Sequence, residues 1–547
     1  MRHLTLALGV ISFACHPLQA QDGGALTVRG LGTLAFPTST RIAAAQQAFV
    51  RGVLLLHLFE YQDAAAAFRD AERLDERFAM AHWGEAMTAN HPVWNEQDVD
   101  AGRAALLRLG ATQPERAAKA STARERAYLG AVEVLYGPGA KPRRDTLYSA
   151  AMGRLARAYP TDDEARLFYA LSLLGLSQGV RNVRTYLLAA AIAESVLARN
   201  PHHAGASHYL IHAVDDPDHA AMGLPAAKAL ARSAPDADHA QHMTSHIFVA
   251  LGRWDDVVAA NETATAVVNE MLRRRNRRPF YCRHYNVWLD YGYVQQGRLL
   301  DATRLLALCR QQAAGEQAES EDLDPDAYSF LTMWSHYLIA TGNWSDSVGR
   351  WPIDPGPRLG PRLTYWFTAS FGAARRGDLP AARSALGEFE RAQAETETWI
   401  AGPEGSGHDQ PELARARVLR SELEGLIAGG EGNVEGELAR LRAATLIEDS
   451  MAYAFGPPFV NQPSHELLGA ELLRLHRFRD ALAQFRIALT RTPRRTAALL
   501  GLARAATGLG DTALAGRTYG ELAGIWRHAD PGQPDVAEAT GFLHPRR

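Results

Sequence analysis

The sequence predicts an all-α fold, a solenoid of stacked helical hairpins, on three observations. From Thr38 onward apolar residues recur at spacings of three and four almost without a break, as amphipathic helices require. The alternation of Val, Ile and Thr with polar residues that is typical of strands is missing from the sequence. Finally, His208 precedes His242 by 34 residues, and His212 precedes His246 by the same interval, which is a period typical of repeated helix–turn–helix units.

Length and composition limit the possible classes of protein. A chain of 547 residues is too long for one compact core, so we expect several domains or one extended solenoid. The 47% of hydrophobic residues and 22% of charged residues are typical of a folded chain. The net charge of −3 gives no general attraction for nucleic acid. A phosphate-binding G-x-x-x-x-G-K-[ST] loop is also missing from the sequence.

The first twenty residues have the pattern of an export signal. The basic start MRH precedes the apolar run LTLALGVISFA, and Leu18-Gln19-Ala20 resembles a small-residue cleavage site. The mature chain would then begin at Gln21, in the periplasm or outside the cell. Anchoring as a lipoprotein through Cys15 is disfavoured, because a large Phe13 stands where a small residue is usual. Beyond the signal, no apolar run reaches the ~18 residues that a membrane-spanning helix needs.

The N-terminal part is expected to be a leader followed by helices. Residues 21–37 contain Gly and Pro and predict an irregular leader. A helix over about 41–58 and a second one starting at Tyr61 form the first hairpin, and a third helix ends before His91-Pro92. The loop over 90–97 carries Trp94, which either lines the rim of a groove or packs the loop itself. Further helices are predicted at about 98–109, 113–137, 144–159, 163–178 and 183–199.

The remaining elements follow from glycine and proline. Gly252, Gly297, Gly342 and Gly377 each stand where a left-handed residue closes one helix before the next begins. Residues 343–361 are rich in Pro and Gly and predict a loop. Helices resume at about 362–376, 379–397, 407–429 and 433–449, followed by hairpins up to residue 527. We therefore expect an N-terminal helical region over 38–200, a central histidine-rich region over 201–350, a C-terminal repeat region over 361–527 and a frayed tail over 528–547.

Two segments carry a resemblance to a known family. YQDAAAAFRDAERLD at 61–75 and RLHRFRDALAQFRIALTRTP at 474–493 place small and large residues in the order of a tetratricopeptide repeat. The chain resembles tetratricopeptide-repeat proteins, most clearly at 45–75, 236–310 and 465–527. Its HxxxHAxD segment at 208–215 and HMxxHI segment at 242–247 are similar to those of a group of exported bacterial repeat proteins. The resemblance implies a right-handed superhelix whose first helices line a concave groove that binds a peptide or a protein.

Removal of the signal leaves Cys282 and Cys309. An exported protein can form a disulfide, but the two cysteines are expected at different heights on the two helices that meet near Gly297. We expect two separate buried thiols.

The histidines form the one group of residues in the sequence that could bind a metal ion or take part in a reaction. His208 and His212 share a helix face, as do His242 and His246, and the 34-residue interval places the two pairs on neighbouring helices. Imidazole is a common ligand of zinc, copper and iron. The spacing predicts a site in which His208, His212, His242 and His246 bind one ion. His239 and Asp215 would be accessory ligands or would hold a ligand in place.

Two other interpretations of the histidines remain open. They can form a polar network packed between helices, or they can line a metal-free groove for a ligand. Alignment of the repeats on their turn glycines places His284, His336 and Glu466 in register with the central histidines, which makes them candidates for that groove. Asp215 also stands where a helix ends before an Asp-Pro turn.

Two functions are consistent with the sequence. The first is an exported scaffold that binds a peptide, protein or envelope ligand in its concave groove. The alternative is a transition-metal-binding protein or metalloenzyme that uses the histidines between 208 and 246. The sequence itself defines neither a substrate or reaction nor the oligomeric state.

Overall fold

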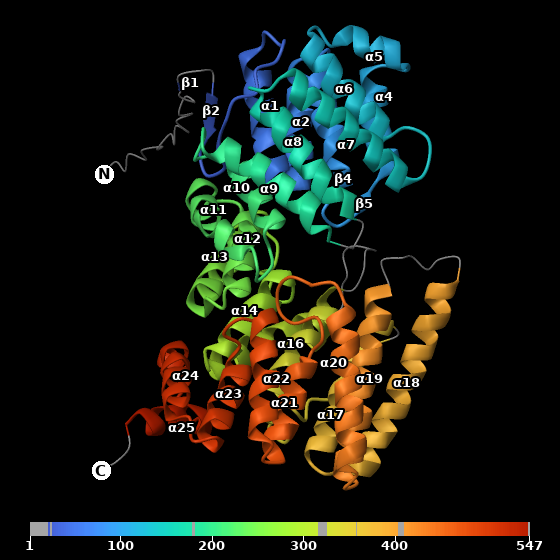
Figure 1. Ribbon diagram of the computed structural model, residues 1–547. Helices are drawn as coiled ribbons and strands as arrows, with labels where there is room; N and C mark the ends of the chain where they lie inside the picture. Colours follow the sequence, from blue (N-terminus) through green and yellow to red (C-terminus); the bar gives the residue numbers. More distant parts are fainter. Residues whose placement is uncertain are drawn as a thin grey trace, which may run out of the picture.

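The computed structural model describes residues 20–21, 25–177, 181–314, 325–356, 358–402 and 410–544. Helices make up most of this part of the chain, and consecutive helices pack on one another as antiparallel hairpins (Figure 1). The predicted all-α solenoid of helical hairpins is confirmed. Among the described residues, no helix combines the length and the apolar character that crossing a membrane demands.

The N-terminal region holds the short strands and the first nine helices. These elements are β1 (Ala20–Gln21), β2 (Ala25–Val28), β3 (Gly32–Leu34), α1 (Ala43–His57), α2 (Tyr61–Leu74), α3 (Ala79–Thr88), β4 (Asn90–His91), β5 (Glu96–Gln97), α4 (Val99–Leu109), α5 (Gln113–Lys119), α6 (Ala123–Leu135), α7 (Lys141–Ala158), α8 (Asp163–Leu174), η1 (Gly175–Ser177) and α9 (Val183–Leu197). The two antiparallel sheets have the orders β1-β2-β3 and β4-β5.

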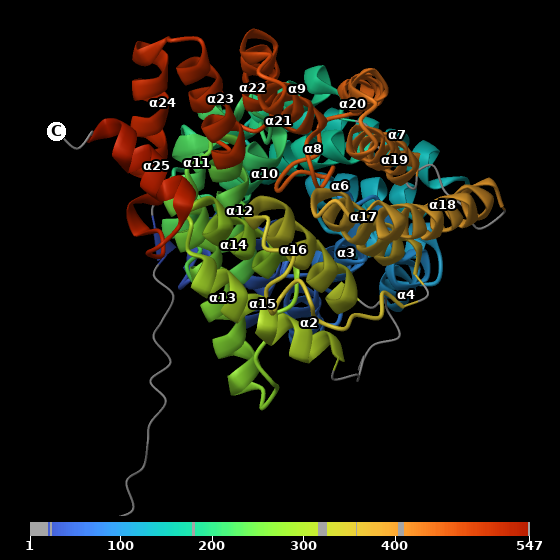
Figure 2. The same ribbon diagram turned by 90° about the horizontal axis from the view of Figure 1, so that it is seen from below.

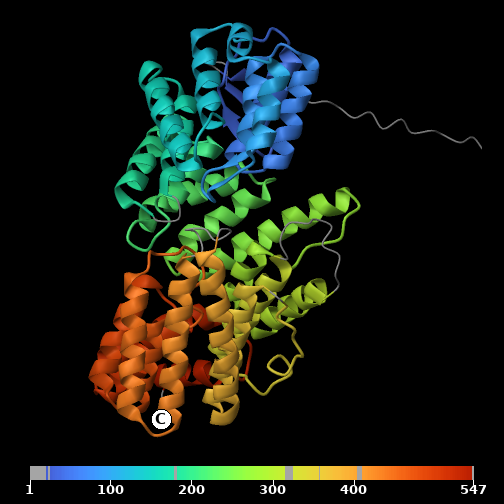
Figure 3. The same ribbon diagram turned by 90° about the vertical axis from the view of Figure 1, so that its right-hand side faces the viewer.

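The middle of the chain connects the two ends of the molecule. It consists of α10 (Ala204–Ala213), α11 (Ala220–Ser233), α12 (Asp238–Ala250), α13 (Trp254–Arg274), α14 (His284–Gln295), α15 (Leu299–Ala314) and α16 (Pro325–Thr341). In Figure 3 the green helices of this region lie between the blue N-terminal helices and the orange C-terminal ones.

The C-terminal region continues the hairpins to the end of the described chain. It consists of α17 (Leu359–Arg375), α18 (Leu379–Ala401), α19 (Gln410–Gly430), α20 (Val434–Ser450), α21 (Ser464–Arg474), α22 (Phe478–Arg491), α23 (Thr496–Gly508), α24 (Thr512–Ile525), η3 (Trp526–His528) and α25 (Pro534–Leu543). The predicted loop over 343–361 is confirmed for its described residues up to Arg358, where α17 is about to begin.

Aromatic rings that fit over glycines hold neighbouring hairpins together. The buried ring of Phe68 on α2 lies so close to Gly52 on α1 and Gly84 on α3 that a Cβ on either glycine would overlap it. Phe485 on α22 occupies the same place between Gly469 and Gly501. Close approach of helix backbones around one large ring gives interior-like packing density without a cavity.

The superhelix closes on itself, because the C-terminal helices α22–α24 come back beside the middle helices (Figure 2). The indole Nε1 of Trp254 donates to the carbonyl oxygen of Arg494 at 2.9 Å, and that of Trp526 donates to the carbonyl oxygen of Gln295 at 3.1 Å. Gly252 has φ +61° in the α12–α13 turn, and a Cβ there would overlap the carbonyl of Pro493. One apolar core consequently extends from Leu31 to Ala539.

The prediction of an irregular leader is wrong for residues 25–34, which form the antiparallel β2–β3 hairpin. The hairpin is followed by Phe36, whose buried ring lies 5.1 Å from both Phe49 and Tyr128. Strands of three and four residues are too short for an alternation to be visible in the sequence. Packing on α1 stabilises them instead.

Two further predictions of elements are wrong. The single helix expected over 113–137 is divided into α5 and α6, because the Thr122 side chain accepts from the Glu125 backbone N–H and starts a new helix with a capping box. The described part of the tail, up to residue 544, is not frayed, since α25 packs on α24. The Tyr519 hydroxyl donates to Glu538 at 2.6 Å, and Arg504 forms an ion pair with the same carboxylate.

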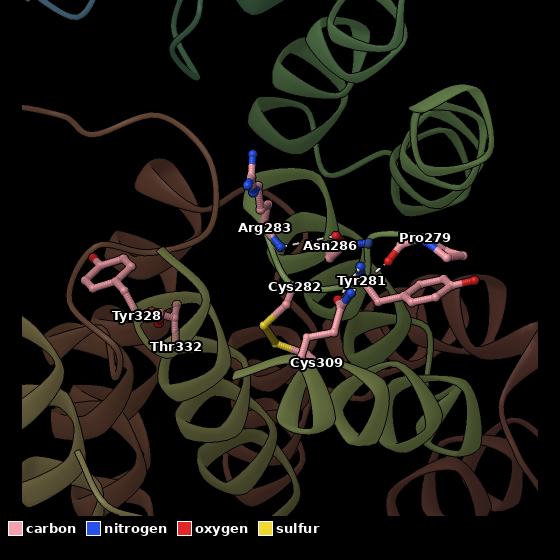
Figure 4. Close-up of a disulfide and its surroundings, with 9 residues drawn as sticks. Pro279, Tyr281, Cys282, Arg283, Asn286, Cys309, Tyr328 and Thr332 are labelled. Carbon is pink, nitrogen blue, oxygen red and sulfur yellow. Dashed lines mark hydrogen bonds between the residues drawn. A yellow bond between two sulfur atoms is a disulfide. The ribbon is translucent and has the colours of Figure 1, made fainter. Parts of the chain in front are cut away.

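The expected pair of separate thiols is also wrong, because Cys282 and Cys309 form a disulfide (Figure 4). Cys282 lies in the turn that precedes α14, not inside that helix, and this position brings its Cα to 4.4 Å from the Cα of Cys309 on α15. Because Cys282 is not part of the helix, its height along the α14 axis does not fix its distance from Cys309. The disulfide connects the start of one hairpin helix to the far part of the other.

Replacing both cysteines by serine should destabilise the α13–α15 region. The disulfide closes a loop with a sequence separation of 27 residues. Loss of that restraint on the unfolded chain costs about 3.5 kcal/mol. Urea denaturation of the native protein and the Cys282→Ser/Cys309→Ser variant would measure the difference. Reductant should lower the midpoint of the native protein and leave the variant unchanged, and two free thiols in the unreduced native protein would contradict the expectation.

Candidate metal centre

Six histidines come together where α12 packs on α10 and its rings contact the first turns of α14. Helix α10 carries His208 and His212, α12 carries His239, His242 and His246, and α14 begins with His284. Because α12 lies between the other two helices, its histidines are shared between two neighbours. They divide into two groups of three.

The first group, here called the inner triad, consists of His208, His212 and His239. One imidazole nitrogen from each lies within 4.8 Å of the other two. His208 and His212 are buried, and His239 is partly exposed. In each of the three, Nε2 is buried and has no hydrogen-bond partner among the described residues.

The second group, the outer triad, consists of His242, His246 and His284, and its nitrogens also lie within 4.8 Å of one another. His242 and His246 are buried, while His284 is exposed at the surface. The outer triad therefore connects the buried histidines to solvent.

Hydrogen bonds determine which nitrogen of these histidines carries the proton. Nδ1 of His246 donates to Oδ2 of Asp215 at 2.5 Å, and Nδ1 of His242 donates to Oδ1 of Asn261 at 2.7 Å. Asn261 is oriented by its own amide, which donates to the Val257 carbonyl. With Nδ1 as the donor, the neutral form of either ring presents a lone pair at Nε2.

The lone pairs of the outer triad are placed where a cation would bind them. Nε2 of His242 and Nε2 of His246 are 3.2 Å apart. Two nitrogens that bind one ion at about 2.0–2.1 Å with a tetrahedral angle are about 3.3 Å apart. The separation therefore matches two ligands of one metal ion.

The inner triad is oriented in the same way by a backbone group. Nδ1 of His208 donates to the carbonyl oxygen of His57 at 2.7 Å, so its unpartnered Nε2 is also a lone pair. A hydrogen bond from Nδ1 to a carbonyl or carboxylate is the usual way in which a protein orients an imidazole ligand.

The prediction of one site with four histidine ligands differs from this arrangement. His208 and His212 belong to one triad, and His242 and His246 to the other, although the rings of His212 and His246 are only 6.0 Å apart. The third members are His239 on α12 and His284 on α14. The 34-residue spacing between pairs of histidines includes neither of them. Two adjoining three-histidine sites replace one four-histidine site.

Burial favours the neutral imidazole in most of the triad histidines. It lowers the pKa of His208 to about 3, with a further contribution from His246. Burial and the neighbouring histidines lower the pKa of His212, His239 and His242 well below the ordinary value. Neutral imidazole is the form that binds a metal ion.

Aromatic rings form the walls of the centre. Phe59 lies 4.4 Å from His208 between ring centroids, and its backbone has the strained φ of +60°. Trp288 lies 4.3 Å from His246, and Tyr285 stacks on His242 at 4.6 Å. Trp94, from the loop predicted as a possible groove rim, lies 5.9 Å from His239. These rings cover part of both triads.

A third histidine group has complete hydrogen bonding and needs no ion. Glu164 accepts from Nε2 of His57 at 2.6 Å and from Nε2 of His203 at 2.9 Å. The Tyr209 hydroxyl contacts Nδ1 of His57, and Nδ1 of His203 accepts from the Ala206 backbone N–H. All three residues are buried, and every imidazole nitrogen has a partner. The group packs the interior behind His208.

The other predicted site residues have different positions. Asp215 contacts Nδ1 of His246, on the side of the ring away from the lone pair. His336 lies on α16 beside Tyr291, two helical turns along α14 from His284, and takes no part in a triad. Glu466 is buried in an ion pair with Arg495 at 2.7 Å. His284, expected in a groove, is the third member of the outer triad instead.

Asn261 has a role that sequence analysis missed. It lies on α13, 19 residues after His242, at no spacing that marks it as a partner of a histidine. Only the packing of α13 on α12 brings its side chain to Nδ1 of His242.

No protein family matches this sequence, and no curated protein matches it. Solved structures with a similar course include a chain of the APC/C hetero-tetramer Cut9–Hcn1, at 12% identity over 92% of this chain and 96% of that chain, with a TM-score of 0.27. Another is Tom70 of yeast, at 12% identity over 91% of this chain and 94% of that chain, with a TM-score of 0.26. At such low similarity the site has to be understood from its own residues.

The metal-free protein should lose stability as the pH falls from about 6.5 toward 3. In the unfolded chain a histidine has a pKa of about 6.5, whereas burial lowers the pKa of folded His208 to about 3. The unfolded state therefore binds more protons in this window, and each such histidine costs about 2 kcal/mol at pH 5. Thermal unfolding midpoints at pH 7.5, 6 and 5 would measure the loss. A His208→Gln/His212→Gln variant should respond less steeply than His202→Gln, an exposed control, and equal slopes would contradict the expectation.

Proposed function

We propose that this protein is a transition-metal protein in which the inner and the outer triad each bind one ion. The main support is the arrangement of two imidazoles. Nε2 of His242 and Nε2 of His246 face each other at 3.2 Å, while both Nδ1 atoms donate to other residues. Zinc, copper and iron are the ions that suit imidazole ligands.

The ligand number favours a reactive site over a structural one. Structural zinc sites have four protein ligands, whereas catalytic sites keep three and leave a position for water or substrate. Each triad supplies three histidines, and the exposed His284 gives solvent access to the outer one. A metalloenzyme is therefore the form of the metal hypothesis that the residues support best.

The competing scaffold hypothesis has less support from the groove candidates. A peptide that used Glu466 would have to break its buried pair with Arg495, and His336 is itself buried. Protein binding elsewhere on the solenoid is compatible with the metal function.

Export to the periplasm or the medium is part of the proposal. The predicted signal at 1–20 lies outside the described residues except for Ala20. The Cys282–Cys309 disulfide supports an oxidising compartment.

Untagged protein purified from the periplasm should contain two equivalents of transition metal per chain by plasma mass spectrometry. His242→Ala/His246→Ala should retain about one equivalent, because it removes two of the three outer ligands. The surface variant His202→Gln should retain two. Native protein that takes up no zinc, copper or iron at neutral pH, even after reconstitution, would refute the proposal.

Removing the groups that orient the proposed ligands should lower the affinity for the metal, although every ligand is kept. Asp215→Ala and Asn261→Ala each free one Nδ1 of the outer triad. Affinity should fall by about 10- to 100-fold. Competition with a chromogenic chelator would measure it, with Asp218→Ala, close in sequence to Asp215, as the control. Unchanged affinity in both variants would show that these hydrogen bonds do not orient ligands.

A further inference from the structure

We propose that the two triads form one dinuclear copper centre, which binds dioxygen and uses it to oxidise an electron-rich aromatic substrate such as an aromatic diol. The inference rests on the proposed metal function and extends it to the metal, the co-substrate and the substrate class.

The spacing of the triads is the first reason. The rings of His212 and His246 are 6.0 Å apart between centroids, and those of His239 and His242 are 6.3 Å apart. Both pairs connect the inner to the outer triad, so two bound ions would be neighbours. With three protein ligands each, both ions keep a position at which a small molecule can bind.

The charge of the ligands is the second reason. All six are imidazoles, and Asp215 is the one carboxylate among the described residues that hydrogen-bonds a triad ring. At one separation and one dielectric constant, two divalent ions repel each other four times as strongly as two monovalent ions. Among zinc, copper and iron, copper has a stable monovalent state, so a ligand set of six imidazoles favours a copper pair.

A pair of copper(I) ions has the electrons that dioxygen needs. Each ion gives one electron, so that dioxygen is reduced to the level of peroxide and both ions become copper(II). An aromatic diol gives two electrons and two protons when its two O–H bonds break and it becomes a quinone. Two diols thus supply the four electrons and four protons that convert one dioxygen to two waters, and both copper ions return to the monovalent state.

Two exposed aromatic side chains lie where such a substrate would arrive. Trp94 is 43% exposed and lies 5.9 Å from His239 of the inner triad. Phe455, in the irregular segment between α20 and α21, is 43% exposed and lies 5.2 Å from His246 of the outer triad. One ring beside each triad gives a planar substrate surfaces on which to stack.

The first test uses full-length protein loaded with copper(I) without oxygen. Addition of dioxygen in an oxygen electrode should consume one dioxygen per two copper ions, and protein loaded with zinc should consume none. Two bound copper ions without oxygen uptake would overturn the inference and leave the proposed metal function intact. Failure to bind any metal would overturn both.

The second test supplies 4-tert-butylcatechol and follows quinone by its absorbance. Two quinones should form per dioxygen, and His242→Ala/His246→Ala with the same copper should form none, which excludes catalysis by free copper. Trp94→Ala/Phe455→Ala should raise KM about tenfold with little change in kcat, because stacking is lost. Trp399→Ala, an equally exposed tryptophan on α18, should leave KM unchanged. Oxygen uptake without diol oxidation would overturn the substrate class, and an unchanged KM would overturn the stacking site.

Discussion

The orientation of the buried triad histidines depends on three hydrogen bonds, made by Nδ1 of His208, His242 and His246. Their acceptors come from distant parts of the chain: the carbonyl of His57 at the end of α1, Asn261 on α13 and Asp215 after α10. Each acceptor holds one ring in the tautomer that exposes a lone pair at Nε2. The orientation of these rings therefore depends on helix packing over about 200 residues, from His57 to Asn261.

Two kinds of histidine group can be compared within this molecule: one with complete hydrogen bonding and one with nitrogens that have no partner among the described residues. The His57–Glu164–His203 group and the triads use the same ring in similarly buried surroundings. In the first, a carboxylate lies between the two imidazoles and every nitrogen has a partner. Among the described residues, no carboxylate takes that place in the inner triad, and its three Nε2 atoms have no hydrogen-bond partner. Unsatisfied buried polar atoms are costly, and a group of three is consistent with the proposed binding of a cation.

A solenoid is well suited to build such a centre. Neighbouring repeats present equivalent positions on adjacent helices, so a histidine in one repeat meets its counterpart in the next at a spacing set by helix packing. Closure of the superhelix adds what an open array would lack. Phe455 from the segment before α21 lies against His246, and the α12–α13 turn is held by Arg494. The C-terminal repeats thereby shield one side of a site made by the middle ones.

The sequence by itself determined the helical solenoid and the helix-ending glycines, and it grouped five of the six triad histidines as candidate ligands, because periodicity and fixed spacing are local properties. It could not show the β2–β3 hairpin, whose short strands depend on packing against α1, or the disulfide, which depends on Cys282 lying outside α14. It also placed four histidines around one ion. Only the tertiary structure divided them into two triads, added His284 and Asn261 and separated His336, since which faces of three helices meet depends on their packing and not on the spacing within any one of them.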